Sequence, residues 1–379
     1  MKIRSKIFII LIMLFILLSF SFISCSGQLS PTATTKVSKE VTTTTQTTTT
    51  VTQSTTSVTE GLSDEENQTT TKEKYKEIDK ISLVLQKVSP SVVNIEFEFD
   101  SKDGSNGVGL LSGTIFTNDG YIITVNPNVE KLKKITVTLQ DGTQLPGDLI
   151  GEDRNTNIAV IKIDAQNPES PVLTSAEDVK VGEIVLSMSR PFGKELNFSQ
   201  GFVLGTGINI TISPDTPTLV DLIKTDTEGK PGTAGGPLVT MEGSIIGINS
   251  LMMPSADSEK FSILAMPSDI ALNIANQIIK YGKSRIPSIG IEIVANTTNI
   301  KGIYVKNVAE NSPAIKAGIK IGDIITEFDG VEVKDPFQFI GQILRKNVGD
   351  LVQLKIYRDG DYITLDLRLE ELEQSKAKK

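Results

Sequence analysis

A succession of short β-type segments between residues 92 and 188 constrains the fold of this chain more than any other feature. Apolar and β-branched residues gather at residues 92–97, 135–139, 158–163 and 181–188, with glycine turns at Asp119-Gly120 and Asp141-Gly142. Asp-Gly pairs between apolar runs are typical of β-hairpins. Many short strands and little helix over roughly 190 residues predict an all-β barrel or sandwich domain.

Helical spacing occurs on either side of this β region. Apolar residues recur at steps of three and four between residues 72 and 88, and Pro90 ends the pattern. A second helix is expected over residues 268–281, with Ser268 and Asp269 as candidate caps and Gly282 after its end. The first globular region is therefore expected to span residues 73–285.

A second globular region is expected over residues 286–372. It alternates β-type segments with a short helix at 313–317, which Gly318 ends, and a helix at 336–346; two closing strands flank an Asp359-Gly360 turn. About 85 residues suit one small α+β domain. The remaining residues, 373–379, form a short basic tail with no evident role.

The N-terminus has the pattern of an export signal. Basic residues in the first six positions precede an unbroken apolar run over residues 7–24. The run ends in Phe22-Ile23-Ser24-Cys25, which resembles a bacterial lipoprotein processing site, and Cys25 is the only cysteine. The resemblance implies a signal peptide at 1–24, a lipidated Cys25 and an extracytoplasmic protein anchored to the bacterial cell membrane. The alternative is an uncleaved signal anchor.

Residues 25–72 are dominated by threonine and serine, including threonine runs at 42–45 and 47–50. A tract with so few large apolar side chains cannot offset the entropy lost on ordering. We expect a disordered tether, with glycosylation left open.

Composition excludes several kinds of site. The chain contains no histidine, the most frequent general base near neutral pH, so neither a Ser-His-Asp nor a Cys-His system can be built. One cysteine cannot supply a Cys-only zinc site or an internal disulfide, and we expect no metal or other cofactor. A net charge of −8 argues against nucleic-acid binding.

Several motifs, in this order, resemble those of the HtrA/Deg family of serine proteases. They are Val-Ser-Pro-Ser-Val-Val-Asn-Ile at 88–95, Asp-Gly-Tyr-Ile-Ile-Thr at 119–124, Gly-Thr-Ala-Gly-Gly-Pro-Leu at 232–238 and Ala-Met-Pro-Ser-Asp at 265–269. The segments 181–185, 191–193 and 243–249 extend the match. The resemblance implies a trypsin-like double β-barrel, the chymotrypsin fold, followed by a PDZ domain.

The same resemblance locates three positions at which the chain departs from the family. The general-base histidine is replaced by Pro127, the aspartate that orients it by Asn157, and the serine nucleophile by Ala234. Proline cannot accept a proton, asparagine carries no charge to stabilise an imidazolium, and alanine has no oxygen that could attack a carbonyl. Losing a triad as a unit costs roughly a million-fold in rate.

The turn around the lost nucleophile keeps its glycines. Gly232 and Gly235 belong to the turn whose backbone N–H groups form the oxyanion hole in the resembled enzymes. The turn is either required by the barrel or retained as a vestigial cleft that receives peptide or anionic groups. A hydroxyl and lysine pair, Thr233 with Lys230, is the remaining route to catalysis, although no spacing argument aligns the two.

The C-terminal region retains the features of a peptide-binding domain. Ser288, Ile289, Gly290 and Ile291 resemble the PDZ loop that receives a peptide's terminal carboxylate, and residues 292–294 would form the strand edge that the peptide extends. Three residues of the helix at 336–346, Phe337, Ile340 and Leu344, share one face and are candidates for the opposite wall of the groove.

These observations predict a membrane-tethered pseudoprotease of the HtrA type that binds unfolded polypeptides or C-terminal peptides in envelope protein quality control or in the regulation of active relatives. Family resemblance suggests that the chain forms a trimer. The oligomer could consist of identical chains or could include active HtrA-type proteases. The alternatives are an active serine endopeptidase and a structural envelope lipoprotein.

Overall fold

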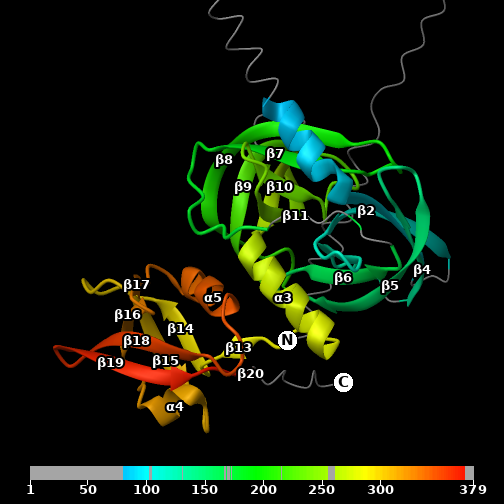
Figure 1. Cartoon of the computed structure of the whole chain (residues 1–379). Coiled ribbons are helices and arrows are strands. Elements are labelled where there is room, and N and C mark those ends of the chain that lie inside the picture. The colour runs from blue at the N-terminus through cyan, green and yellow to red at the C-terminus, as the bar shows by residue number, and fades with distance from the viewer. Residues whose placement is uncertain are drawn as a thin grey trace, which may run out of the picture. The chain divides into compact units, whose positions relative to one another are not determined.

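The region predicted to be all-β forms two closed six-stranded barrels, as the family resemblance implied (Figure 1). The computed structural model describes residues 80–101, 105–129, 131–165, 168, 171, 173–214, 216–254 and 261–371. These residues belong to one compact unit. The expected signal, tether, lipidation site and basic tail lie outside them.

The first barrel has the strand order β1-β2-β3-β6-β5-β4, and its neighbouring strands are antiparallel. Its strands are β1 (Val92–Asp100), β2 (Asn106–Ile115), β3 (Tyr121–Val125), β4 (Lys131–Thr138), β5 (Gln144–Asp153) and β6 (Ile158–Ile163). Its core contains Val93, Ile95, Ile122, Val137 and Ile161, all at most 3% exposed. β-branched side chains suit this position because they pack well on a pleated surface.

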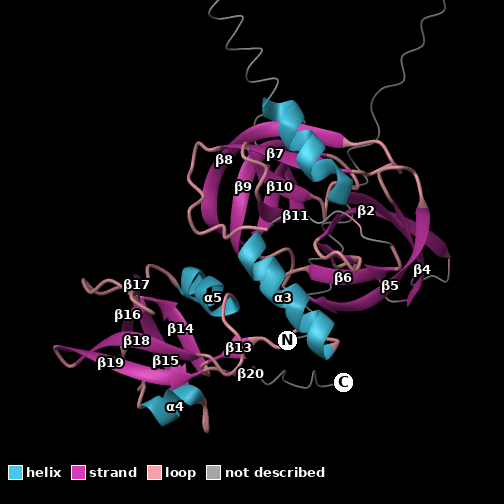
Figure 2. Ribbon diagram, in the orientation of Figure 1, coloured by secondary structure: helices cyan, strands magenta, loops and turns pink. Residues whose placement is uncertain are grey.

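The second barrel has the strand order β10-β11-β12-β9-β8-β7, and Figure 2 draws the strands of both barrels in magenta. Its strands are β7 (Ile184–Ser189), β8 (Asn197–Ile210), β9 (Leu219–Gly229), β10 (Pro237–Thr240), β11 (Ile245–Pro254) and β12 (Phe261–Pro267). β7 begins three residues later than predicted. Gly182, at φ +88°, makes a turn there and donates its N–H to Val203, which leaves Val181 exposed.

The described helices before and after the barrel strands both pack against the barrels. The helix at residues 80–88 covers the second barrel, where Val84 and Val88 join Leu186 and Met188 in a buried cluster. It is followed by the 3-10 turn η1 (Ser89–Ser91), which contains Pro90, so the predicted stop is confirmed. Helix α3 (Ser268–Tyr281) buries Ile270, Ile274 and Ile278 among strands of both barrels.

The ends of α3 differ in how well the sequence predicted them. Gly282 is left-handed and donates its N–H to Ile278 at 2.8 Å, as expected for a helix C-terminus. The predicted N-terminal caps are wrong, because Pro267 occupies the cap position and no side chain caps the helix. Ser268 donates its hydroxyl to the Thr174 carbonyl instead, and Asp269 lies in the first turn.

The C-terminal domain is α+β, as predicted. Its main sheet has the order β14-β15-β16-β18-β19, with β17 paired to β16, and β13 pairs with β20. The strands are β13 (Pro287–Ser288), β14 (Ile291–Ala295), β15 (Ile303–Val308), β16 (Ile324–Phe328), β17 (Val331–Glu332), β18 (Leu351–Arg358), β19 (Asp361–Arg368) and β20 (Glu370–Glu371). Helices α4 (Pro313–Ala317) and α5 (Pro336–Leu344) begin after the caps Ser312 and Asp335.

No helix within the described ranges is long and apolar enough to cross a membrane. In that same part of the chain, no group of three or more Cys, Asp or Glu side chains is arranged to hold a metal ion.

Candidate functional site

The turn between β9 and β10 packs directly against the first barrel. Gly232 and Gly235 adopt φ of +83° and +92°, a region that disfavours other residues. A Cβ atom on Gly235 would lie 2.0 Å from the Ser112 carbonyl oxygen and 2.4 Å from Thr124 Oγ1. Glycine is therefore required here by both backbone conformation and space.

Ser112, a fully buried residue of β2, holds this turn in place. Its N–H donates to the Ala234 carbonyl at 2.9 Å, and its hydroxyl donates to the Gly232 carbonyl at 2.7 Å. The same hydroxyl accepts the Arg190 N–H at 2.9 Å, and the Ser112 carbonyl accepts the Thr124 hydroxyl at 2.7 Å. One small side chain thus joins the two barrels at the turn.

The turn presents two backbone amides that are not used within the fold. The N–H groups of Thr233, Gly235 and Gly236 donate to backbone carbonyls at 2.7 to 3.2 Å. In contrast, the N–H groups of Gly232 and Ala234 have no acceptor among the residues that the structure describes. Paired free amides on a fixed turn are suited to an oxygen with negative charge.

Pro127 and Asn157 lie on neighbouring segments of the first barrel. The N–H of Asn126, directly before Pro127, donates to the Asn157 carbonyl at 3.0 Å. Asn157 has a left-handed φ of +61°, and its side-chain amide donates to the Ser250 hydroxyl at 3.1 Å. Its side chain is therefore held by β11 of the second barrel.

Two buried amide atoms beside these segments lack partners within the described part of the chain. They are Nδ2 of Asn126, a donor, and Oδ1 of Asn249, an acceptor. Asn249 also binds the turn, since its carbonyl accepts the Gly235 N–H at 2.7 Å. The buried polar groups described here are amides and hydroxyls that hydrogen-bond between the two barrels.

The hydroxyl and lysine pair is not assembled. Thr233 is buried and its hydroxyl accepts the Lys230 N–H at 3.1 Å. The Lys230 ammonium points to Glu228, 3.9 Å from its carboxylate. The structure therefore gives the Thr233 oxygen a role in closing the turn, with no contact to the lysine ammonium.

The predicted carboxylate loop joins β13 to β14. Gly290 has φ +77°, and a Cβ atom there would lie 2.4 Å from Ser312 Cβ. Its carbonyl accepts the Ala309 N–H and its amide donates to the Ser288 hydroxyl at 3.1 Å. Ile289 is buried in the domain core, and Ile291 begins β14, which is an edge strand of its sheet.

The three helix residues predicted for the groove are separated by the structure. Phe337 and Ile340 are 40% and 37% exposed on α5, while Phe339 and Ile343 share the domain core with the β14 residue Ile291. Leu344 corrects the prediction, because it is 3% exposed and packs in the cluster that α3 forms with the barrels. Helical periodicity groups it with the other two, but contact with α3 determines its environment.

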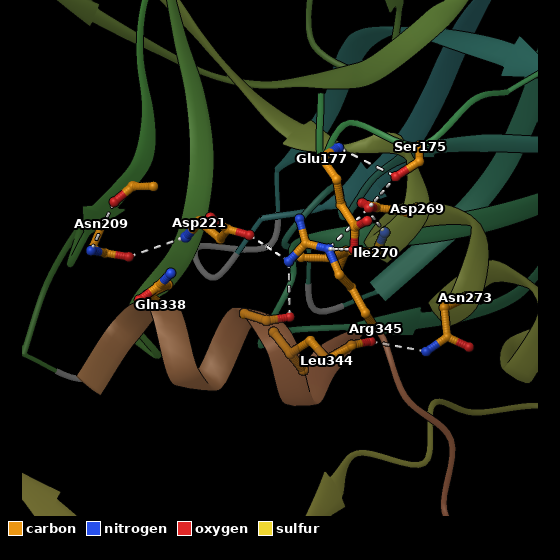
Figure 3. A network of polar contacts seen from close by, with 12 residues as sticks. Ser175, Glu177, Asn209, Asp221, Asp269, Ile270, Asn273, Gln338, Leu344 and Arg345 are labelled. Atoms are coloured by element: carbon orange, nitrogen blue, oxygen red, sulfur yellow. Dashed lines mark hydrogen bonds and ion pairs between the residues drawn. The ribbon is translucent and has the colours of Figure 1, made fainter. Parts of the chain in front are cut away.

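The end of α5 is bound to the barrels through Arg345. Figure 3 shows this side chain reaching Asp221 of β9 on one side and Asp269 of α3 on the other. The distances are 2.5 Å from Nη1 to Asp221 and 2.9 Å from Nε to Asp269. Asn273 of α3 also donates to the Leu344 and Lys346 carbonyls at 2.9 Å.

Burial and the neighbouring charges together set the pKa values of Asp221 and Arg345. Burial is the largest single cause that raises the pKa of Asp221; with the nearby Asp269 and Asp335 carboxylates it outweighs the Arg345 guanidinium, which lowers the pKa. Burial also disfavours the charged guanidinium, but the two carboxylates outweigh it and raise the pKa of Arg345. Close approach is possible because residue 341 is glycine, since a Cβ atom there would lie 2.8 Å from Asp221 Cβ.

Sequence reasoning missed Ser112, Asn126 and Arg345. Asn126 lies beside the motif at 119–124 and directly before Pro127, so its position could have drawn attention, whereas Ser112 lies outside the segments that match family motifs. Arg345 gives no such signal, because its partners are 124 and 76 residues away in the sequence.

The comparisons with known proteins agree with this architecture. Residues 111–248 match the family model of the trypsin-like peptidase domain and residues 287–369 that of the PDZ domain. The chain is 32% identical over 343 residues to the serine protease Do-like HtrA of Bacillus subtilis (strain 168), covering 80% of this chain and 76% of that protein. It is 33% identical over 262 residues to a probable periplasmic serine endoprotease, DegP-like, of Halomonas elongata, covering 67% and 54%.

Solved structures of similar proteins include peptide complexes. The HtrA-type protease AlgW with a tripeptide matches at a TM-score of 0.62 and 27% identity, covering 78% of this chain and 98% of that one. The same protease with a decapeptide matches at a TM-score of 0.59 and 26% identity, covering 77% and 98%.

Proposed function

The chain belongs to the HtrA family of trypsin-like serine proteases with a PDZ domain, and from that premise we propose that it binds polypeptide segments without cleaving them. The observation that carries the proposal is Ala234, a methyl group on a turn whose backbone is otherwise held in place. By family resemblance this is the nucleophile position. By the same resemblance, Pro127 and Asn157 occupy the positions of the base and of the carboxylate that orients it.

The surroundings of these positions support a loss of peptidase activity. Within the described residues, the hydroxyl and lysine candidates are otherwise engaged, because the Thr233 oxygen closes the turn and Lys230 pairs with Glu228. The free amides of Gly232 and Ala234 could still receive a peptide carbonyl. An oxyanion hole and binding alone retain only about 10³ to 10⁴ of rate enhancement over water.

The PDZ domain supports the binding part of the proposal. The open edge of β14, the exposed side chains of Phe337 and Ile340, and the left-handed Gly290 suit an extended peptide with a terminal carboxylate. AlgW, a related HtrA-type protease, has been solved with peptides.

An active serine endopeptidase is the second candidate, and it is favoured by the relatives, which are named serine proteases. An unfolded-substrate cleavage assay on the purified chain separates the two. We expect no turnover by the wild type or by Ala234→Ser, since no base is present, and measurable turnover only when Ala234→Ser is combined with Pro127→His and Asn157→Asp. Wild-type cleavage that disappears in Thr233→Val or Lys230→Ala would contradict the proposal.

Peptide capture tests the PDZ domain separately. Gly290→Leu places a side chain in a left-handed position against Ser312, and should abolish capture of peptides with an apolar C-terminus. Gly330→Leu is the matched control, because it is also left-handed but its Cβ has nothing within 4 Å. Absence of capture by the wild type would favour the third candidate, a structural envelope lipoprotein, whereas equal capture by wild type and Gly290→Leu would contradict the role of this loop.

Location and partners complete the proposal. We place the chain outside the cytoplasm, anchored through a lipid on Cys25, where it would act in envelope quality control or on active HtrA-type proteases as a homo- or hetero-oligomer. Curated relatives named periplasmic endoproteases support the compartment, and the sequence around Cys25 supports the anchor.

A further inference from the structure

The loop between β13 and β14 is held through its carbonyl groups. The Ile289 carbonyl accepts the N–H of Ala314 in α4 at 2.9 Å, and the Gly290 carbonyl accepts the Ala309 N–H at 2.9 Å. Both peptide units are trans, so the C=O and N–H bonds within each unit point in opposite directions. The N–H groups of Gly290 and Ile291 are therefore turned away from the residues that hold the loop.

These two N–H groups differ in what they contact. Ile291 pairs with Val308 in the antiparallel ladder. The bond from the Ala309 N–H to the Gly290 carbonyl is the kind that flanks a non-hydrogen-bonded pair, so the Ile291 N–H points to the open edge of β14. The Gly290 N–H, in contrast, donates to the hydroxyl oxygen of Ser288 at 3.1 Å. One of the two amides is thus occupied by the chain itself.

The backbone of this loop is fixed more firmly than the Ser288 side chain. Gly290 has φ +77°, and a Cβ atom there would lie 2.4 Å from Ser312 Cβ. Ile289 is 2% exposed and belongs to the core of the domain. A ligand that reaches the Gly290 N–H therefore meets a preformed backbone, and the group that has to move is the hydroxyl.

The contact between Ser288 and Gly290 is easily exchanged. Both residues are half-buried, and this is the one hydrogen bond of the Ser288 side chain within the part of the chain that the structure describes. A hydroxyl leaves its position by rotating about a single side-chain torsion. A hydrogen bond to a neutral oxygen is about half as strong as one to a carboxylate. A peptide's terminal carboxylate can therefore displace the hydroxyl oxygen.

We propose that Ser288 is a built-in competitor for the terminal carboxylate of a bound polypeptide and thereby sets the affinity of the PDZ domain. In the free protein its hydroxyl oxygen occupies the Gly290 N–H, and a peptide binds only to the fraction of molecules in which this bond is broken. This role rests on the proposed function, because it concerns the same loop. It adds to that function an inhibitory contact that the peptide must replace.

Calorimetric titration of the full-length protein with an acetylated tetrapeptide that ends in valine and leucine measures the competition. Ser288→Ala leaves the Gly290 N–H to water, so the affinity should rise about three- to tenfold, the worth of one neutral hydrogen bond. Ser288→Val also lacks the hydroxyl and suits a strand, so it should bind more tightly as well. Ser288→Thr keeps a hydroxyl and should bind as the wild type does.

The same tetrapeptide with a C-terminal carboxamide shows where the hydroxyl acts. It should bind more weakly to every variant, because its terminal oxygen carries no charge. Ser288→Ala should nevertheless tighten its binding by the same factor, since the competitor acts in the free protein. A gain confined to the carboxylate peptide would place the effect in the complex and overturn the proposal.

Thr298→Ala is the matched control. The Thr298 hydroxyl accepts the Ile300 N–H at 3.2 Å, the same two-residue spacing, but in the loop that follows β14. This change should leave the affinity unaltered, and thermal unfolding checks that each variant is folded. A wild type that binds the peptide and a Ser288→Ala variant that binds it no more tightly would overturn the competitor role and leave the proposed function intact. Absence of binding by the wild type and all three Ser288 variants at about 1 mM peptide would overturn both.

Discussion

Replacing Arg345 by methionine tests whether ion pairs stabilise the contact between the PDZ domain and the barrels. The side chains of Arg345, Asp221 and Asp269 are 17%, 17% and 19% exposed, so all three are largely removed from water. Methionine keeps the length of the apolar stem and leaves two carboxylates without their cation. Removing one partner of a buried pair costs about 3–5 kcal/mol, and the residual exposure places the expected loss near the lower end, about 3 kcal/mol.

Urea unfolding of the full-length protein measures this loss. The control is Arg154→Met, which breaks an exposed ion pair with Glu152 at 4.0 Å and should change the unfolding free energy by less than about 1 kcal/mol. Arg345→Met combined with Asp221→Asn should recover part of the loss, because one stranded charge is removed. If Arg345→Met lowers the unfolding free energy no more than Arg154→Met does, apolar packing holds the PDZ domain against the barrels and the reasoning fails.

Three further predictions concern the Asp221 carboxylate and its pH dependence, the Ser112 hydrogen bonds at the turn, and the membrane anchor. Because the folded-state pKa of Asp221 is raised above the ordinary 3.8, its contribution to stability is complete below that pH and is lost as the pH rises. The unfolding free energy of the wild type relative to Asp221→Asn should fall as the pH rises above the ordinary pKa of 3.8, and urea unfolding that shows a constant or rising difference would contradict this. Ser112→Ala removes a donor to Gly232 and an acceptor for Arg190, so the free energy of unfolding should fall by about 1–3 kcal/mol; an unchanged urea midpoint would argue against the role of Ser112. Cys25→Ala should shift the protein from the membrane fraction to the soluble fraction and abolish incorporation of labelled palmitate, whereas a protein that stays in the membrane fraction would indicate an uncleaved signal anchor.

The sequence predicted the helices and strands better than the tertiary contacts between them. Helix α3 was predicted with its observed bounds, because its apolar spacing is regular and Gly282 marks its end. The double barrel was implied by the family resemblance, whereas the pattern of strands and glycine turns alone predicted only an all-β barrel or sandwich domain. Leu344 could not be placed, because its position on the helix suits a groove and an interface equally, and only the packing of α5 on α3 distinguishes them. The buried donors and acceptors around Ser112 and Arg345 depend on residues brought together from distant strands.

Gly341 sets how closely the PDZ domain can approach the barrels. A methyl group at this position would overlap the β-carbon of Asp221, so the helix could remain docked only by moving away from β9. The contact between the PDZ domain and the barrels is thus limited by steric overlap as well as held by charges. Gly341→Ala would leave the ion-pairing side chains unchanged but would hold the PDZ domain at a different distance from the barrels. The contact between the two domains could then be altered without changing the charges, the PDZ groove or the Ala234 turn.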